Sequence, residues 1–143
     1  MEVSLDFYKT FSQKHTMRFY GYWGDSSDGI PFYKFLNQGR PATFVGMKYD
    51  QLLGNQMKIL RGEYRYKFNN FVYFKAAGNA ALDFEQRWPG FTYNPSLLWG
   101  FGAGVQISTP AGPLELGYSV GSKSLLQPKS AQSVVYLALG ARF

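Results

Sequence analysis

The feature that most constrains the fold is a pair of alternating segments joined by a Pro-Ala-Gly turn, in residues 100–121, GFGAGVQISTPAGPLELGYSVG. Successive side chains of a strand point to opposite faces, so each segment has an apolar face and a face of glycine or small polar residues. The apolar face carries Trp99, Phe101, Ala103, Val105, Ile107, Leu114, Leu116, Tyr118 and Val120. A soluble sandwich turns large aliphatics inward and charged residues outward, whereas the reverse face here is mostly glycine. The pattern predicts an antiparallel sheet with lipid on the apolar side and a polar lumen on the other, as in a transmembrane β-barrel.

Composition narrows the class of protein further. Aromatic residues make up 19% of the chain and 16 residues are glycine, as expected for an aromatic-rich β-protein. Mean hydropathy is -0.24, and no apolar run approaches the roughly 18 residues that a membrane helix needs. The net charge of +6 is scattered along the chain, so no nucleic-acid partner is predicted. At 143 residues a single domain, 1–143, is expected.

Alternation predicts seven strands in all. They begin near Glu2, Thr16, Gln56, Phe71, Leu97, Gly112 and Ser133. The connections alternate between short turns and long loops at 24–54, 84–95 and 121–132, and Thr43–Tyr49 is a short extended piece within the first loop. Short periplasmic turns and long external loops are the convention of the bacterial outer membrane, which is the predicted location. The last strand ends in Phe143, at the predicted periplasmic end, and resembles the C-terminal signal of outer-membrane barrels.

Charged residues on two neighbouring strands form the main candidate site. The predicted cluster on the lumen side consists of Arg61, Glu63, Arg65, Lys67, Lys75 and Asp83. Buried charges are costly unless they are paired, so the simplest interpretation is that these groups neutralise one another. The functional interpretation is a polar pore, or a dock for the long external loop 24–54. That loop carries Ile30, Phe32, Phe35, Leu36 and Phe44, which is too apolar for a wholly solvated loop and predicts that it folds back over or into the lumen.

Other motifs predict no chemistry in this chain. Gly117-Tyr118-Ser119-Val120-Gly121 matches a nucleophile elbow, but Ser119 lies on an alternating strand with no helix after it. His15, the only histidine, falls in a predicted turn. Residues 25–29 resemble a calcium loop without its closing glutamate. Neither a metal site nor a cofactor is predicted.

Two segments carry a family resemblance. Residues 100–121 followed by a strand ending in Phe143, and residues 30–68 upstream, resemble the C-terminal barrel strands and long loop of the outer-membrane protein 85 superfamily of bacterial surface antigen barrels. The superfamily includes barrel-assembly proteins, two-partner secretion transporters and patatin-linked type V autotransporters. The resemblance covers roughly residues 30–143 and implies that Glu63 and Arg65 lie at the family's glutamate and arginine positions.

The loop tip departs from that family pattern. Assembly and secretion members usually carry an arginine in a Val/Leu-Arg-Gly-Phe/Tyr motif, and the matching residues here are Phe44, Val45, Gly46 and Met47. Val45 therefore replaces the arginine that the resemblance would dock inside the lumen. The missing arginine favours the patatin-linked branch, whose catalytic domain would lie upstream in a parent protein.

The expected function is membrane anchoring with translocation, assembly or display of a passenger or partner protein, rather than catalysis. The expected partners are outer-membrane lipid, a passenger or substrate protein and the barrel assembly machinery. Alternatives are a soluble up-and-down β-barrel that binds a small apolar ligand, and an outer-membrane lipase. Bacterial single-chain barrels have an even number of strands, so seven strands require a further explanation. Thr43–Tyr49 could supply an eighth strand, or two copies could pair their edges as a homodimer. We expect instead that the chain is part of a larger, 16-stranded family barrel.

Overall fold

The structure is a computed structural model that describes residues 1–26, 35–38, 43–48, 52–88, 91–93, 97–110, 112–124 and 127–139. Its regular elements are all strands, as the alternation predicted. Within the described residues there is no helix long and apolar enough to cross a membrane.

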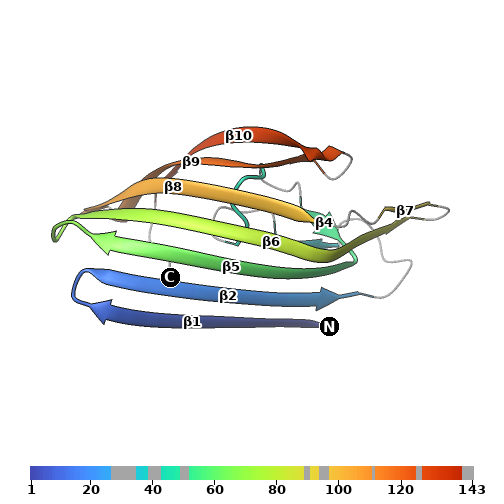
Figure 1. Cartoon of the computed structure of the whole chain (residues 1–143), viewed down its shortest axis with the longest axis horizontal. Coiled ribbons are helices and arrows are strands. Elements are labelled where there is room, and N and C mark those ends of the chain that lie inside the picture. Colours follow the sequence, from blue (N-terminus) through green and yellow to red (C-terminus); the bar gives the residue numbers. More distant parts are fainter. Residues whose placement is uncertain are drawn as a thin grey trace.

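Seven long strands form one antiparallel sheet in chain order (Figure 1). They are β1 (Glu2–Ser12), β2 (His15–Asp25), β5 (Gln56–Lys67), β6 (Val72–Trp88), β8 (Leu98–Thr109), β9 (Gly112–Ser124) and β10 (Gln127–Leu139). Each pairs with the next along the chain, so the sheet is a meander without crossovers. Period-2 alternation explains these strands, because each can then offer an apolar and a polar face.

The sheet is open. Among the described strands β1 and β10 lie at its two edges and are not paired with each other. The chain therefore forms an antiparallel all-β sheet that is not closed into a barrel by its own strands. Pro128 lies in β10, where an edge strand tolerates a residue that cannot donate to a ladder.

Two turns follow directly from their residues. The Asn69 side chain accepts hydrogen bonds from the backbone N–H groups of Phe71 and Val72, both at 2.8 Å, which closes the turn between β5 and β6. Between β8 and β9, Thr109 pairs with Gly112, whose φ of 114° lies in the region that favours glycine.

The structure differs from the sequence prediction in three places. β6 continues to Trp88 and pairs with β7 (Phe91–Tyr93), so much of the predicted loop 84–95 is a hairpin, which projects beyond the sheet (Figure 1). β9 and β10 extend to Ser124 and from Gln127, so the predicted loop 121–132 is mostly strand; polar residues there pair as an irregular ladder with a register shift. The described part of the predicted extended piece, 43–48, is a turn and not a strand. Instead β3 (Leu36–Asn37) pairs with β4 (Leu53–Gly54).

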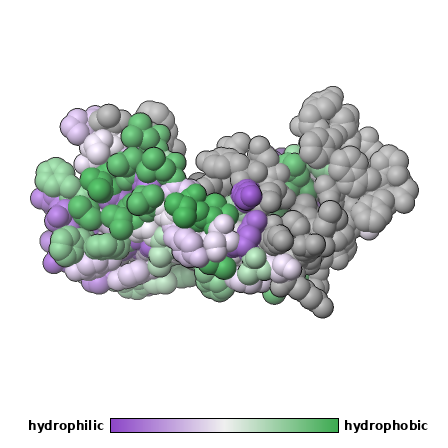
Figure 2. Space-filling model, turned by 90° about the horizontal axis from the view of Figure 1, so that it is seen from above, coloured by the Kyte–Doolittle hydropathy of each residue, from purple (hydrophilic) through white to green (hydrophobic). Residues whose placement is uncertain are grey.

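Large apolar side chains are exposed on one side of the sheet, the apolar face. Leu60 is 61% exposed in β5, Leu116 56% in β9 and Leu137 69% in β10. Similar exposed residues on this face are Leu5, Phe7, Phe19, Tyr64, Phe74, Phe101, Tyr118 and Val135. Viewed from above, hydrophobic residues gather over much of the described surface, with hydrophilic residues beside and between them (Figure 2). These side chains are too many and too continuous for an ordinary solvated surface.

The opposite side, the polar face, is covered at one end by the segment between β2 and β5. Phe44 and Leu52 from that segment pack with Met57 and Ile59 of β5 and Leu98 of β8, all fully buried. The hydrophobic core is therefore small and lies between the sheet and this covering segment. Beyond the core, the polar face carries charged side chains.

Candidate functional site

Glu63 is the centre of a buried charge network on the polar face. Its carboxylate lies 2.6 Å from the Arg61 guanidinium, 3.8 Å from Arg65 and Lys75, and 4.0 Å from Arg18. The side chains of Glu63, Arg61 and Lys75 are almost completely buried. The strands β2, β5 and β6 are adjacent, and their register places Arg18 opposite Glu63 and Arg65 opposite Lys75. Their charged residues therefore meet at this point.

The network continues across the sheet in both directions. Lys75 donates to Glu115 of β9 at 2.9 Å, and the hydroxyl of Tyr136 in β10 donates to the other Glu115 oxygen at 3.2 Å. On the other side Arg18 makes a two-point contact with Asp6 of β1, at 2.7 Å for each bond. Charged and hydroxyl groups therefore link the polar face from β1 to β10.

The structure brings together four of the six predicted cluster residues, namely Arg61, Glu63, Arg65 and Lys75. Lys67 lies at the end of β5, opposite Tyr73 and away from this centre. The side chain of Asp83 lies outside the described part of the chain.

Sequence reasoning missed Arg18, Asp6 and Glu115 as members of the network. All three were on the polar side of their strands by alternation, so the signal was present. Using it required the register between strands, which places Arg18 opposite Glu63.

The predicted loop tip, Phe44, Val45, Gly46 and Met47, is buried against the polar face. The backbone N–H of Val45 donates to the Asn79 side-chain oxygen at 2.7 Å, and the Asn79 amide donates back to the Val45 carbonyl at 3.3 Å. The Gln132 amide of β10 donates to the Gly46 carbonyl at 3.3 Å. The tip is thus held through its backbone by two side-chain amides from β6 and β10.

A floor of glycines lets the tip approach the sheet this closely. A Cβ added to Gly100 would lie 1.8 Å from the Val45 carbonyl oxygen. One added to Gly121 would lie 2.9 Å from Cα of Gly46. Gly46 itself has a φ of 91° and offers no room for a side chain, since an added Cβ would lie 2.7 Å from the Val120 carbonyl oxygen.

These contacts explain the glycines at positions 100 and 121, whereas a Cβ added to Gly117 would instead lie 2.2 Å from the Tyr136 ring. Phe35 and Leu36 of the same covering segment are also buried, whereas Ile30 and Phe32 lie outside the described residues. The described part of the long loop therefore packs onto the polar face, as its apolar content predicted.

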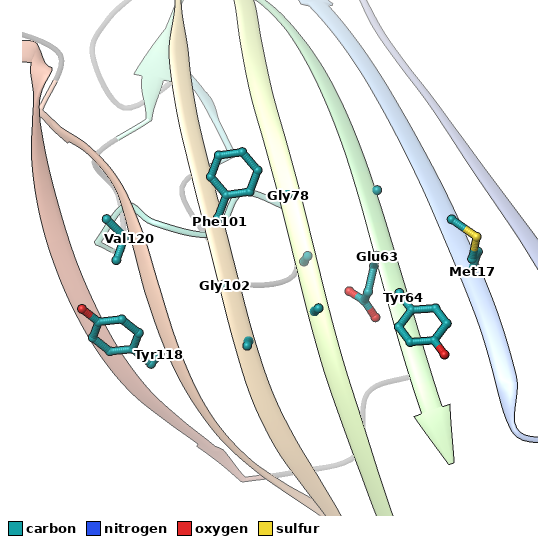
Figure 3. Close-up of a pocket in the computed structure, with 12 residues that line it drawn as sticks. Met17, Glu63, Tyr64, Gly78, Phe101, Gly102, Tyr118 and Val120 are labelled. Carbon is teal, nitrogen blue, oxygen red and sulfur yellow. The ribbon is translucent and has the colours of Figure 1, made fainter. Parts of the chain in front are cut away.

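On the apolar face a shallow hollow of about 610 Å³ crosses β5, β6 and β8. Its floor is formed by small residues such as Gly62, Ala76 and Gly78. Met17, Tyr64, Phe101 and Tyr118 stand around it (Figure 3).

The remaining motifs lie in ordinary structural settings. Ser119 is 2% exposed in the middle of β9, with its hydroxyl 3.4 Å from the Val134 carbonyl, and does not lie on a strand-to-helix turn. His15 begins β2 and shares a 2.5 Å hydrogen bond with the Tyr64 hydroxyl. Within the described residues no group of three potential metal ligands occurs. Phe143 lies outside those residues.

Comparison with models of known protein families found no match, and neither did a search of curated proteins.

Proposed function

We propose that this sheet is part of the wall of a transmembrane β-barrel in the bacterial outer membrane. In this role it anchors, and translocates or helps to assemble, a passenger or partner protein. The observation that carries the proposal is the inverted distribution of side chains. Exposed aliphatic and aromatic residues cover the apolar face of the long strands, while buried charges lie on the polar face.

The apolar face argues for lipid as the first partner. An antiparallel sheet in water has one face on a core and one solvated face, which is polar. Here the hydrophobic core lies on the polar face, under the docked loop, and the apolar face has no covering element among the described residues. Hydrocarbon is the environment that such a face matches.

The charge network supports a structural role for its members. Its four cations and three carboxylates nearly balance, and the closest pairs are hydrogen-bonded. Pairing of this kind is what allows charges to remain buried. We assign the network to holding the strands in register beneath the loop, and the loop tip to covering the passage on the polar side.

The alternatives fit less well. A soluble carrier barrel would turn its large apolar residues toward a ligand, but Leu60, Leu116 and Leu137 point away from the loop-covered face. A lipase centred on Ser119 would need an exposed hydroxyl near a base. Ser119 instead lies in the middle of a strand, where it is buried and its hydroxyl contacts the backbone carbonyl of Val134 in the neighbouring strand.

Vesicle flotation tests the membrane assignment. The chain is refolded with vesicles of bacterial phospholipid and centrifuged through a density gradient, with carbonate washing to remove peripheral proteins. We expect the chain to float with lipid and to resist the wash. A folded monomer that remains in plain buffer and does not float would overturn the proposal, while hydrolysis of a fatty-acyl ester lost in Ser119→Ala would favour the lipase.

A further inference from the structure

The two open edges of the sheet run in the same direction. Six antiparallel pairings connect β1 to β10, through β2, β5, β6, β8 and β9. Each pairing reverses the strand direction, and six reversals restore it. β1 and β10 are therefore parallel to each other, although they lie at opposite ends of the sheet.

Both edges are long, and no other described strand pairs with either of them. β1 has 11 residues and β10 has 13, and β1 is exposed along its whole length. Edge strands in water are usually shortened, bulged or covered. In hydrocarbon each unsatisfied backbone group costs several kcal/mol, so edges of this length require pairing partners.

From this geometry we propose that the sheet is completed by a different β-segment that supplies an odd number of membrane-spanning strands. The inference rests on the proposed membrane function and identifies the partner of the two edges. An odd number is required because the added strands must be antiparallel both to β1 and to β10. The total is then even, as in bacterial single-chain barrels.

A second copy of this chain does not meet the requirement. If two copies insert in the same membrane orientation, β10 of one copy lies parallel to β1 of the other at both junctions between the copies. Antiparallel self-pairing would need β1 against β1, which inverts one copy across the bilayer. The outer membrane receives all copies from one side, so this arrangement is confined to detergent.

The docked loop sets a lower limit on the number of added strands. Eight strands enclose a space that side chains, or one small ligand, already fill. Here residues 35–38, 43–48 and 52–54 occupy the polar face in addition to its charged side chains. One added strand would leave no room for this segment, so the partner supplies at least three strands.

Disulfide cross-linking of the chain itself is the first test. The sequence has no cysteine, so single cysteines can be placed at Leu5 or Phe7 in β1 and at Ser133 or Val135 in β10. Pairs of variants are mixed, inserted into phospholipid vesicles by purified assembly machinery, which fixes orientation, and oxidised. We expect β1-to-β10 cross-linking between copies to be no stronger than the background given by a control cysteine at Leu60. Efficient β1-to-β10 cross-linking would overturn the proposal.

Two fusions test the parity directly. Residues 72–124, which contain β6, β8 and β9, are duplicated before residue 1 to give ten strands. Residues 98–124, which contain β8 and β9, give nine in the matched control. We expect β1 and β10 to resist amide exchange and trypsin in the ten-strand protein only. Equal protection in both fusions would overturn the parity rule.

The outcomes separate this inference from the membrane proposal. If neither fusion floats with vesicles, the membrane function fails while amide exchange in detergent still reports whether the edges close. If neither fusion folds, the cross-linking result on the chain itself decides.

Discussion

Val45 and Asn79 exchange two hydrogen bonds, with the backbone of one matched to the side-chain amide of the other. This pairing imitates one step of a β-ladder between the loop tip and β6. Valine at position 45 offers only its backbone to this pairing. The docking of the loop therefore depends on an uncharged amide from the sheet.

Replacement of Asn79 by alanine should release the loop tip. The change leaves the buried N–H and C=O groups of Val45 without these partners, which costs about 1–3 kcal/mol per unsatisfied group. We expect a lower unfolding free energy and new protease cleavage near residues 43–48. Asn79→Asp retains the acceptor for the Val45 N–H group and loses the donor. An uncleaved Asn79→Ala protein would show that glycine packing alone holds the tip.

Gly100→Ala should displace the loop for a steric reason. The new methyl group would lie 1.8 Å from the Val45 carbonyl oxygen, so the tip or the strand must shift. Gly62→Ala is the matched control, because nothing lies within 4 Å of its added Cβ. We expect protease sensitivity at residues 43–48 in the first variant and the wild-type pattern in the second. Equal patterns would argue against close docking.

Glu63→Gln should destabilise the sheet strongly. The change leaves Arg61 and Lys75 buried beside a neutral group, and breaking a buried pair typically costs about 3–5 kcal/mol. Glu85, which pairs with Arg87 at 2.6 Å near the end of β6, is the control. That pair is more exposed, so Glu85→Gln should cost less than about 1 kcal/mol. Urea unfolding in lipid vesicles gives both values, and similar costs would remove Glu63 from its central role.

The proposed contact of the apolar face with lipid can be tested by placing the same charge on each face. Leu116→Arg puts a guanidinium on the apolar face and should cost roughly 2–4 kcal/mol near the bilayer midplane. Gln106→Arg, on the polar face opposite Glu115, should cost much less. A folding titration in vesicles measures the difference. Equal costs at the two positions would mean that the apolar face does not contact hydrocarbon.

Strand positions and facing could be read from the sequence because both depend on local alternation. All seven predicted strands are present, and Phe101, Leu116 and Tyr118, which the alternation placed on the apolar face, are exposed. Local pattern failed where strands continue into segments with turn-type residues. The β6–β7 hairpin and the extended β9–β10 ladder contain proline, glycine and polar residues that are typical of loops.

The site was predictable only in part, for a different reason. Residues on one strand, such as Arg61 and Glu63, share a face by period alone. Contacts between Asn79, Gln132 and the loop tip depend on inter-strand register and on the path of a loop across the sheet. Neither property is encoded within a short window of residues.

The alternation of the two faces has a consequence for the proposed location in the outer membrane. A translocon diverts a segment sideways into the inner membrane when the segment is continuously hydrophobic over the length of a helix. In each long strand here, every second residue points to the polar face, and the charged residues of β5 interrupt its apolar side chains. No strand can thus act as a stop-transfer sequence. The surface that matches hydrocarbon exists only after the strands have paired. In the proposed outer-membrane role, the chain would therefore cross the inner membrane unfolded and be retained by the outer one.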